Sequence, residues 1–130
     1  MKVKIITSII QLILTGVIAG LFTDCKKSDD GTLADIDGNI YNMVTIGSQV
    51  WMVENLKVTK YNDGTIIQLV TDYNEWINLT TGAYCWYDNI LTNKNPYGAL
   101  YNWYTVNTGK ICPLGWHVPT INEWTALITF

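Results

Sequence analysis

Few side chains in this sequence are suited to catalysis or metal binding. The 130-residue chain has one histidine, His117, and three cysteines. Catalysis by a histidine needs a nucleophile or a carboxylate beside it, and the local sequence Gly115-Trp116-His117-Val118-Pro119 reads instead as a rigid connector. No Cys/His spacing supplies the three or four ligands of a transition-metal site. We therefore expect a structural His117, no catalytic residues, no metal and no cofactor.

Cys25 is the first candidate for a chemical modification. Lys2 and Lys4 precede an uncharged apolar stretch over residues 5–22, and Cys25 and a polar segment follow. A basic start, an apolar stretch and a polar break are typical of a secretory signal. A cysteine directly after the apolar stretch is the lipid acceptor expected of a bacterial lipoprotein. We therefore predict a helical signal peptide over residues 1–24, lipidation of Cys25 and a polar tether over 25–33.

The lipoprotein interpretation implies attachment to a membrane through the N-terminal lipid, at the outer membrane and on the cell surface. Leu21-Phe22-Thr23-Asp24-Cys25 resembles a lipobox, except that Asp24 stands where Gly, Ala or Ser is usual. An uncleaved membrane anchor and a cleaved form without lipid remain alternatives, because about 18 apolar residues are also the lower limit of a membrane span.

Cys85 and Cys112 form an even pair once Cys25 carries lipid. In a chain that leaves the reducing cytosol, such a pair predicts a disulfide. Two buried thiols are the alternative. A redox role is disfavoured because the sequence has no Cys-x-x-Cys motif.

Composition excludes several classes of protein. The length fits one domain, and a hydrophobic fraction of 48% is too high for a disordered chain. The net charge is −3 and arginine is absent, so a nucleic-acid partner is not expected. Asp35, Asp37 and Asn39 alternate around Gly38, which predicts a turn, because the closing Glu of a calcium loop is missing.

Aromatic residues are the remaining candidates for binding. Trp and Tyr rings can stack on sugar faces, and Trp76, Trp86 and Tyr87 lie near segments rich in Asn and Thr. We take these three as candidate ligand-binding residues, with a place in the core as the alternative for each Trp. The other tryptophans after residue 50 are predicted to build the core: Trp51, Trp103, Trp116 and Trp124.

Short strands are predicted first along the chain. Residues 39–46 and 49–56 alternate in hydrophobicity around Gly47-Ser48, which predicts a β-hairpin with a type II′ turn. Residues 65–70 and 83–87 are further strand candidates. Residues 72–79 fit a short helix or a loop, and the polar stretch 88–95 fits a loop.

Two helices are predicted after residue 95. Asn95 is a suitable N-cap and Pro96 suits a first turn, and helical spacing of apolar residues then continues to Gly109. Residues 111–119 should form an extended connector. Thr120 and Glu123 have the spacing of a capping box. The second helix should bury a stripe of Trp124, Leu127 and Ile128.

Several dense motifs occur in a fixed order, and together they carry a family resemblance. They are Asp37-Gly38-Asn39-Ile40-Tyr41, Gln49-Val50-Trp51-Met52, Tyr61-Asn62-Asp63-Gly64, Gly82-Ala83-Tyr84-Cys85-Trp86-Tyr87, Tyr97-Gly98-Ala99-Leu100-Tyr101-Asn102-Trp103 and Cys112-Pro113-Leu114-Gly115-Trp116-His117-Val118-Pro119-Thr120. From residue 34 to 130, the chain closely resembles the Fibrobacter succinogenes major paralogous domain. The resemblance implies a secreted or surface lipoprotein with an α+β, C-type-lectin-like fold, shared with formylglycine-generating enzymes.

Members of that family continue with Gly-rich and Trp-rich strands after the segment that ends here, so this chain resembles an N-terminal portion and a partial fold. The calcium sites of true C-type lectins and the catalytic cysteines of formylglycine-generating enzymes would lie in that later part, and are not carried over. We expect a non-catalytic module that binds an extracellular glycan or protein. A non-functional truncated paralogue and, less favoured, a fragment of a formylglycine-generating-type enzyme remain alternatives.

Overall fold

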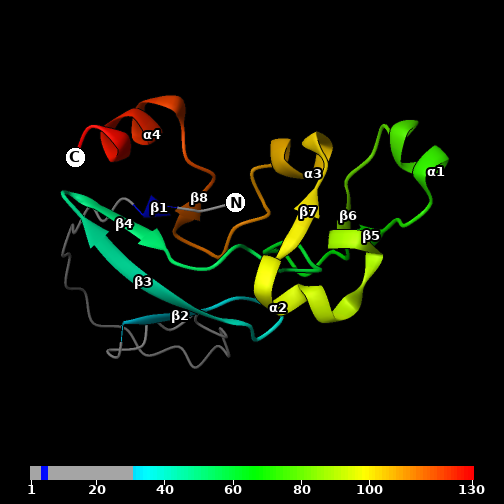
Figure 1. The fold of residues 1–130 in the computed structure, drawn as a ribbon, viewed down its shortest axis with the longest axis horizontal. Coiled ribbons are helices and arrows are strands. Elements are labelled where there is room, and N and C mark those ends of the chain that lie inside the picture. The colour runs from blue at the N-terminus through cyan, green and yellow to red at the C-terminus, as the bar shows by residue number, and fades with distance from the viewer. Residues whose placement is uncertain (1–3, 6–30) are drawn as a thin grey trace, which may run out of the picture.

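The chain folds into two β-sheets with short helices around them (Figure 1). This computed structural model describes residues 4–5 and 31–130. The larger sheet has the strand order β2-β3-β4-β1-β8, and the smaller one has the order β5-β6-β7. Strands and helices are mixed along the chain, so the fold class is α+β, as predicted.

The larger sheet is built from β1 (Lys4–Ile5), β2 (Thr32–Ala34), β3 (Ile40–Ile46), β4 (Gln49–Met52) and β8 (Trp116–His117). The smaller sheet is built from β5 (Gln68–Leu69), β6 (Ala83–Trp86) and β7 (Ala99–Tyr101). The α-helices are α1 (Tyr73–Ile77), α2 (Lys94–Tyr97), α3 (Trp103–Asn107) and α4 (Ile121–Ile128). Two 3₁₀ turns, η1 (Tyr87–Asn89) and η2 (Leu91–Asn93), connect β6 to α2.

The predicted β-hairpin is confirmed. β3 and β4 pair antiparallel, with Ile46 opposite Gln49, so that Gly47 and Ser48 form the two-residue link. Gly47 has a φ of 59° and Ser48 has no positive φ, which fits a type II′ turn rather than type I′. The hairpin buries Trp51 and Met52 of β4 and Tyr41 of β3.

The first predicted helix is wrong, because a strand interrupts it. α2 ends at Gly98, which has φ 72° and ψ −161°, a conformation almost restricted to glycine. The next three residues form β7, which pairs with β6, and α3 begins only after Asn102. A Cβ on Gly98 would lie 2.6 Å from the Cβ of Asn55 and 2.7 Å from the carbonyl oxygen of Leu56. The close approach of these two backbones, which helical spacing does not reveal, redirects the chain into a strand.

The capping box of the last helix is confirmed, but its buried stripe is wrong. The Thr120 hydroxyl accepts from the Glu123 amide, and the Glu123 carboxylate accepts from the Thr120 amide. No residue of α4 is buried. The Trp124 ring contacts Trp51 at a centroid distance of 5.1 Å, whereas Ile128 is 79% exposed. Among the described residues, the apolar face of α4 is only partly covered, since Trp124 packs on Trp51 and Leu127 is half-buried.

Asp35 and Asp37 hold the start of the domain against the segment after β4. The buried Asp35 carboxylate accepts from the amides of Asp37 and Asn39, and from the Tyr41 hydroxyl at 2.6 Å. The Tyr41 oxygen in turn accepts from the Lys57 amide at 3.1 Å. Burial and the Asp35 carboxylate raise the pKa of Tyr41 far above its usual value, so the phenol stays a donor. The predicted turn is confirmed, and the Asp35 carboxylate in it accepts its hydrogen bonds from groups of the protein itself.

Asp37 makes the second link to the same segment. Its carboxylate accepts from the Thr59 hydroxyl at 3.0 Å and pairs with Lys60 at 3.2 Å. Burial opposes ionisation, but the hydrogen bonds from the Thr59 amide and from Lys60 outweigh it and lower the pKa of Asp37. This ion pair is therefore present at neutral pH and weakens as the pH falls below the usual pKa of an aspartate.

Most of the predicted signal peptide and tether, including Cys25, lies outside the described residues. Lys4–Ile5 forms β1 within the larger sheet. In the described part of the chain, no helix is long and apolar enough to span a membrane.

Substitution of Gly98 should destabilise the fold more than the same change at another glycine with positive φ. We expect Gly98→Ala to lower the free energy of unfolding by about 2–4 kcal/mol, because it combines backbone strain with a steric clash. Gly109 has a φ of 68°, but a Cβ there meets no atom within 4 Å. Gly109→Ala should therefore cost only about 1 kcal/mol. Urea unfolding followed by tryptophan fluorescence measures both, and equal losses would contradict the close approach at Gly98.

Candidate functional site

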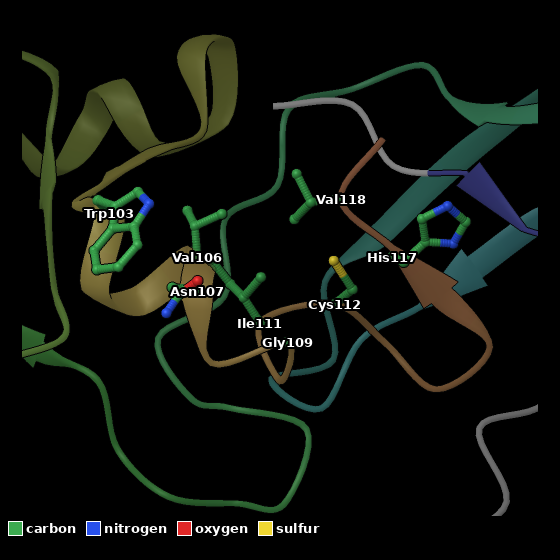
Figure 2. A pocket seen from close by; sticks show the side chains of 8 residues that line it. All are labelled: Trp103, Val106, Asn107, Gly109, Ile111, Cys112, His117 and Val118. Carbon is green, nitrogen blue, oxygen red and sulfur yellow. The ribbon is translucent and has the colours of Figure 1, made fainter. Parts of the chain in front are cut away.

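A cavity of about 300 Å³ opens between α3 and the segment that contains β8 (Figure 2). Its size is at the lower end of ligand pockets in proteins. Trp103 and His117 lie at opposite ends, with apolar side chains between them (Figure 2). The lining consists of Trp103, Val106, Asn107, Gly109, Ile111, Cys112, His117 and Val118.

Asn102 positions the α3 wall of the cavity. As the N-cap of α3, its side-chain oxygen accepts from the Thr105 amide at 3.0 Å and from the Ala83 amide at 3.1 Å. Its side-chain amide donates to the carbonyl of Thr81 at 2.7 Å. The buried Thr105 hydroxyl donates to the Ala83 carbonyl at 3.0 Å. These bonds fix α3 against the start of β6 and leave Trp103, in the first helical position, directed outward.

The loop after α3 forms the base of the cavity and is held by the segment 61–64. The Asn62 side chain donates to the Cys112 carbonyl at 3.1 Å, and the Asn62 amide donates to the Lys110 carbonyl at 2.8 Å. Lys110 pairs with Asp63 at 2.9 Å. The hydrogen bond from Lys110, with one from the Thr65 amide, lowers the pKa of Asp63 to about 2. Because this pair is exposed, it fixes geometry rather than adding much stability.

His117 is bound to the cap of α4. Its Nε2 lies 2.9 Å from Oε2 of Glu123, and the same oxygen accepts from the Thr120 amide at 2.9 Å. The sequence favours a structural His117, and in the structure the partner of this histidine is a carboxylate. This carboxylate belongs to the capping box, so the pair joins β8 to α4.

The predicted disulfide is absent, since Cys85 and Cys112 are free thiols. Alternation along β6 turns Tyr84 and Trp86 into the core cluster that also contains Cys112, and places Cys85 on the opposite face of the strand. Cys112 lines the cavity, whereas Cys85 does not (Figure 2). Burial raises the pKa of Cys112 to about 12, so this thiol is protonated and is not an activated nucleophile.

The three aromatic residues predicted to bind a ligand lie outside the lining of this cavity. Trp86 is 5% exposed and stacks edge-on against Tyr84 at 5.1 Å in the core, which is the alternative role stated for it. Tyr87 is 48% exposed and contacts Tyr97 at 5.2 Å. Trp76 lies on α1 and is half-buried. None of the three lines the cavity.

Trp103 is the residue that sequence reasoning missed. The sequence predicts it in the core, yet it is 65% exposed at the rim of the cavity. Its ring contacts Tyr104 edge-on at 5.4 Å. The Asn at position 102 is the signal that could have found it, because an N-cap there starts a new helix and turns the next residue toward solvent.

The lining combines aromatic, amide and apolar side chains with His117. In residues 4–5 and 31–130, no group of three or more His, Cys, Asp or Glu side chains could hold a metal ion. The cavity offers an exposed indole, an Asn amide and apolar walls. This combination matches a ligand with a flat apolar face and a polar edge.

The state of the two thiols can be tested directly. After unfolding without a reductant, Cys85 and Cys112 should both react with iodoacetamide, with the sites mapped by mass spectrometry. In the folded chain Cys112 should react far more slowly than Cys85, because it is buried and a rise of its pKa from 9 to about 12 reduces the thiolate about a thousandfold. If both residues were labelled only after reduction, the result would show that Cys85 and Cys112 form the predicted disulfide.

No curated protein and no solved structure matches this chain. A family model does match: the Fibrobacter succinogenes major domain aligns with residues 44–130. The matched region starts within β3 and includes β4, both walls of the cavity and α4. The chain therefore belongs to the Fibrobacter succinogenes major domain family.

Proposed function

We propose that this chain is a cell-envelope lipoprotein whose domain, related to the C-type-lectin-like fold, binds an extracellular glycan in the cavity beside Trp103. The single observation that carries the proposal is the exposed indole of Trp103 at the rim of a preformed cavity. The exposed indole offers a flat apolar face and a polar N–H edge, which suits it to stack on a sugar ring.

The other lining groups complement such a ligand. Asn107 supplies both a donor and an acceptor for hydroxyl groups, and Val106 and Val118 provide apolar walls. The Cys112 thiol is protonated, and His117 is bonded to Glu123 of the capping box, so this site has no activated nucleophile. Binding without catalysis is therefore the activity that the cavity supports best.

The sequence of the N-terminus supports the location. The apolar stretch before Cys25 and the polar residues after it have the order of a lipoprotein signal and its acceptor. Lipidation of Cys25 would place the domain outside the cytoplasm, attached to the outer membrane, where polysaccharides are accessible.

Glycan binding should depend on Trp103 and not on Trp76. An array of immobilised glycans identifies the best-bound sugar, and isothermal titration with the corresponding free oligosaccharide measures affinity. Trp103→Ala should weaken binding roughly tenfold or more, as for an aromatic anchor. Trp76→Ala on α1 is the matched control and should bind normally. Loss of binding in Trp76→Ala, with Trp103→Ala unaffected, would refute the cavity as the site and favour the surface around Trp76 that the sequence suggests.

Lipid attachment should depend on Cys25. In cells fed radiolabelled palmitate, the wild-type chain should carry label and sediment with membranes, whereas Cys25→Ser should carry none. Cys85→Ser keeps the acceptor and serves as the control. Label in Cys25→Ser, or an intact mass that retains residues 1–24, would refute processing at Cys25.

A further inference from the structure

β1 separates two strands of the larger sheet that do not pair with each other in the described part of the chain. It lies between β4 and β8 and is antiparallel to both (Figure 1). β4 and β8 therefore run in the same direction. The register places Lys4 opposite Trp51 and His117, and Ile5 opposite Val50 and Trp116. We call the space between β4 and β8 the strand slot.

The occupant of the strand slot belongs to the segment that lipoprotein processing would remove. This step rests on the proposed function, because cleavage before Cys25 separates residues 1–24 from the domain. The facing edges of β4 and β8 then lose their backbone partners, and unpaired edges of this kind add a strand from another chain. We infer that in the processed protein the strand slot binds an extended segment of a partner polypeptide in which basic and apolar residues alternate.

The first position of such a segment faces the core. Trp116 belongs to the core cluster, and Val50 packs against it. A residue opposite both strands at this level points to the same face as these two side chains. It must therefore be apolar, since a charge there would be buried without a partner.

The neighbouring position faces α4. Trp51 contacts Trp124 of α4, and His117 is bonded to Glu123 of the same helix. A residue between Trp51 and His117 thus points toward an indole and a carboxylate. A basic side chain suits both, because it is attracted to the carboxylate and can lie over an aromatic ring.

The residue types at the two register positions match these requirements. Lys4 stands at the level of Trp51 and His117, and Ile5 stands at the level of Val50 and Trp116. The sequence Lys2-Val3-Lys4-Ile5 alternates basic and apolar residues, so a partner segment with the same alternation would meet both requirements. β4 is four residues long, so a partner segment of about four to six residues would fill the strand slot.

A peptide with the sequence of residues 2–7 tests the inference. The full chain with Ile5→Pro, produced in the cytoplasm where it is not processed, has the strand slot emptied, because proline removes an amide donor and disfavours a central strand. Amide hydrogen exchange in residues 49–52 and 116–117 should accelerate on the order of tenfold, as expected for the loss of backbone hydrogen bonds. Added peptide should restore protection in a saturable manner.

Two altered peptides serve as matched controls. A peptide with Ile5→Asp should fail to restore protection, because it places a charge toward the core. A peptide with Lys4→Glu should bind more weakly than the parent. Equal rescue by all three peptides, or no rescue by the parent peptide, would overturn the inference.

Exchange in β6 and β7 reports whether the variant remains folded, because neither strand belongs to the larger sheet. If Ile5→Pro also exposes β6 and β7, Ile5→Gly replaces it and the same rescue is required. If amide protection in the strand slot rose with the concentration of the variant itself, without peptide, the occupant would be a second copy of this chain. That result would overturn the inference of a partner polypeptide. The peptide test does not depend on processing, whereas the Cys25 labelling does, so failure of either proposal is recognised separately.

Discussion

The buried carboxylate of Asp35 is the constraint on which the rest of the domain depends. It accepts a hydrogen bond from the Tyr41 hydroxyl, whose oxygen in turn accepts one from the Lys57 amide. A buried charge is tolerated only when hydrogen bonds replace its hydration. Meeting that demand fixes the segment after β4, and two residues of this segment, Leu56 and Val58, lie in the core cluster shared with the smaller sheet. A local turn thereby sets the relation between the two sheets.

Local signals in the sequence predicted the parts of the fold that local physics decides. The hairpin followed from alternation around Gly47-Ser48, and the start of α4 followed from Thr120 and Glu123. These patterns depend on residues close to one another in the chain, so the sequence contains their whole cause. The family, and with it the α+β class, was predicted from dense sequence motifs that occur in a fixed order.

The parts that failed depend on contacts between distant residues. The chain turns at Gly98 because its backbone approaches Asn55 and Leu56, which are more than forty residues earlier, and no periodicity encodes that approach. The same break separates α2 from α3 and so places Trp103 in the first turn of a new helix. The even number of remaining cysteines predicts a disulfide between Cys85 and Cys112. The pleat of β6, however, turns Cys85 away from the core cluster that contains Cys112. Trp103 was therefore missed because the end of one helix and the start of the next, which Asn102 marks, were not recognised.

One oxygen atom joins the wall of the cavity to the last helix. Oε2 of Glu123 accepts from the first amide of the capping box and also meets His117. A rotation of α4 cannot leave β8 in place without breaking one of these bonds. The apolar side of α4 is largely exposed among the described residues, and the bond to His117 links this helix to the lining of the cavity. Any shift of α4 that breaks this bond would therefore also change the cavity lining at His117.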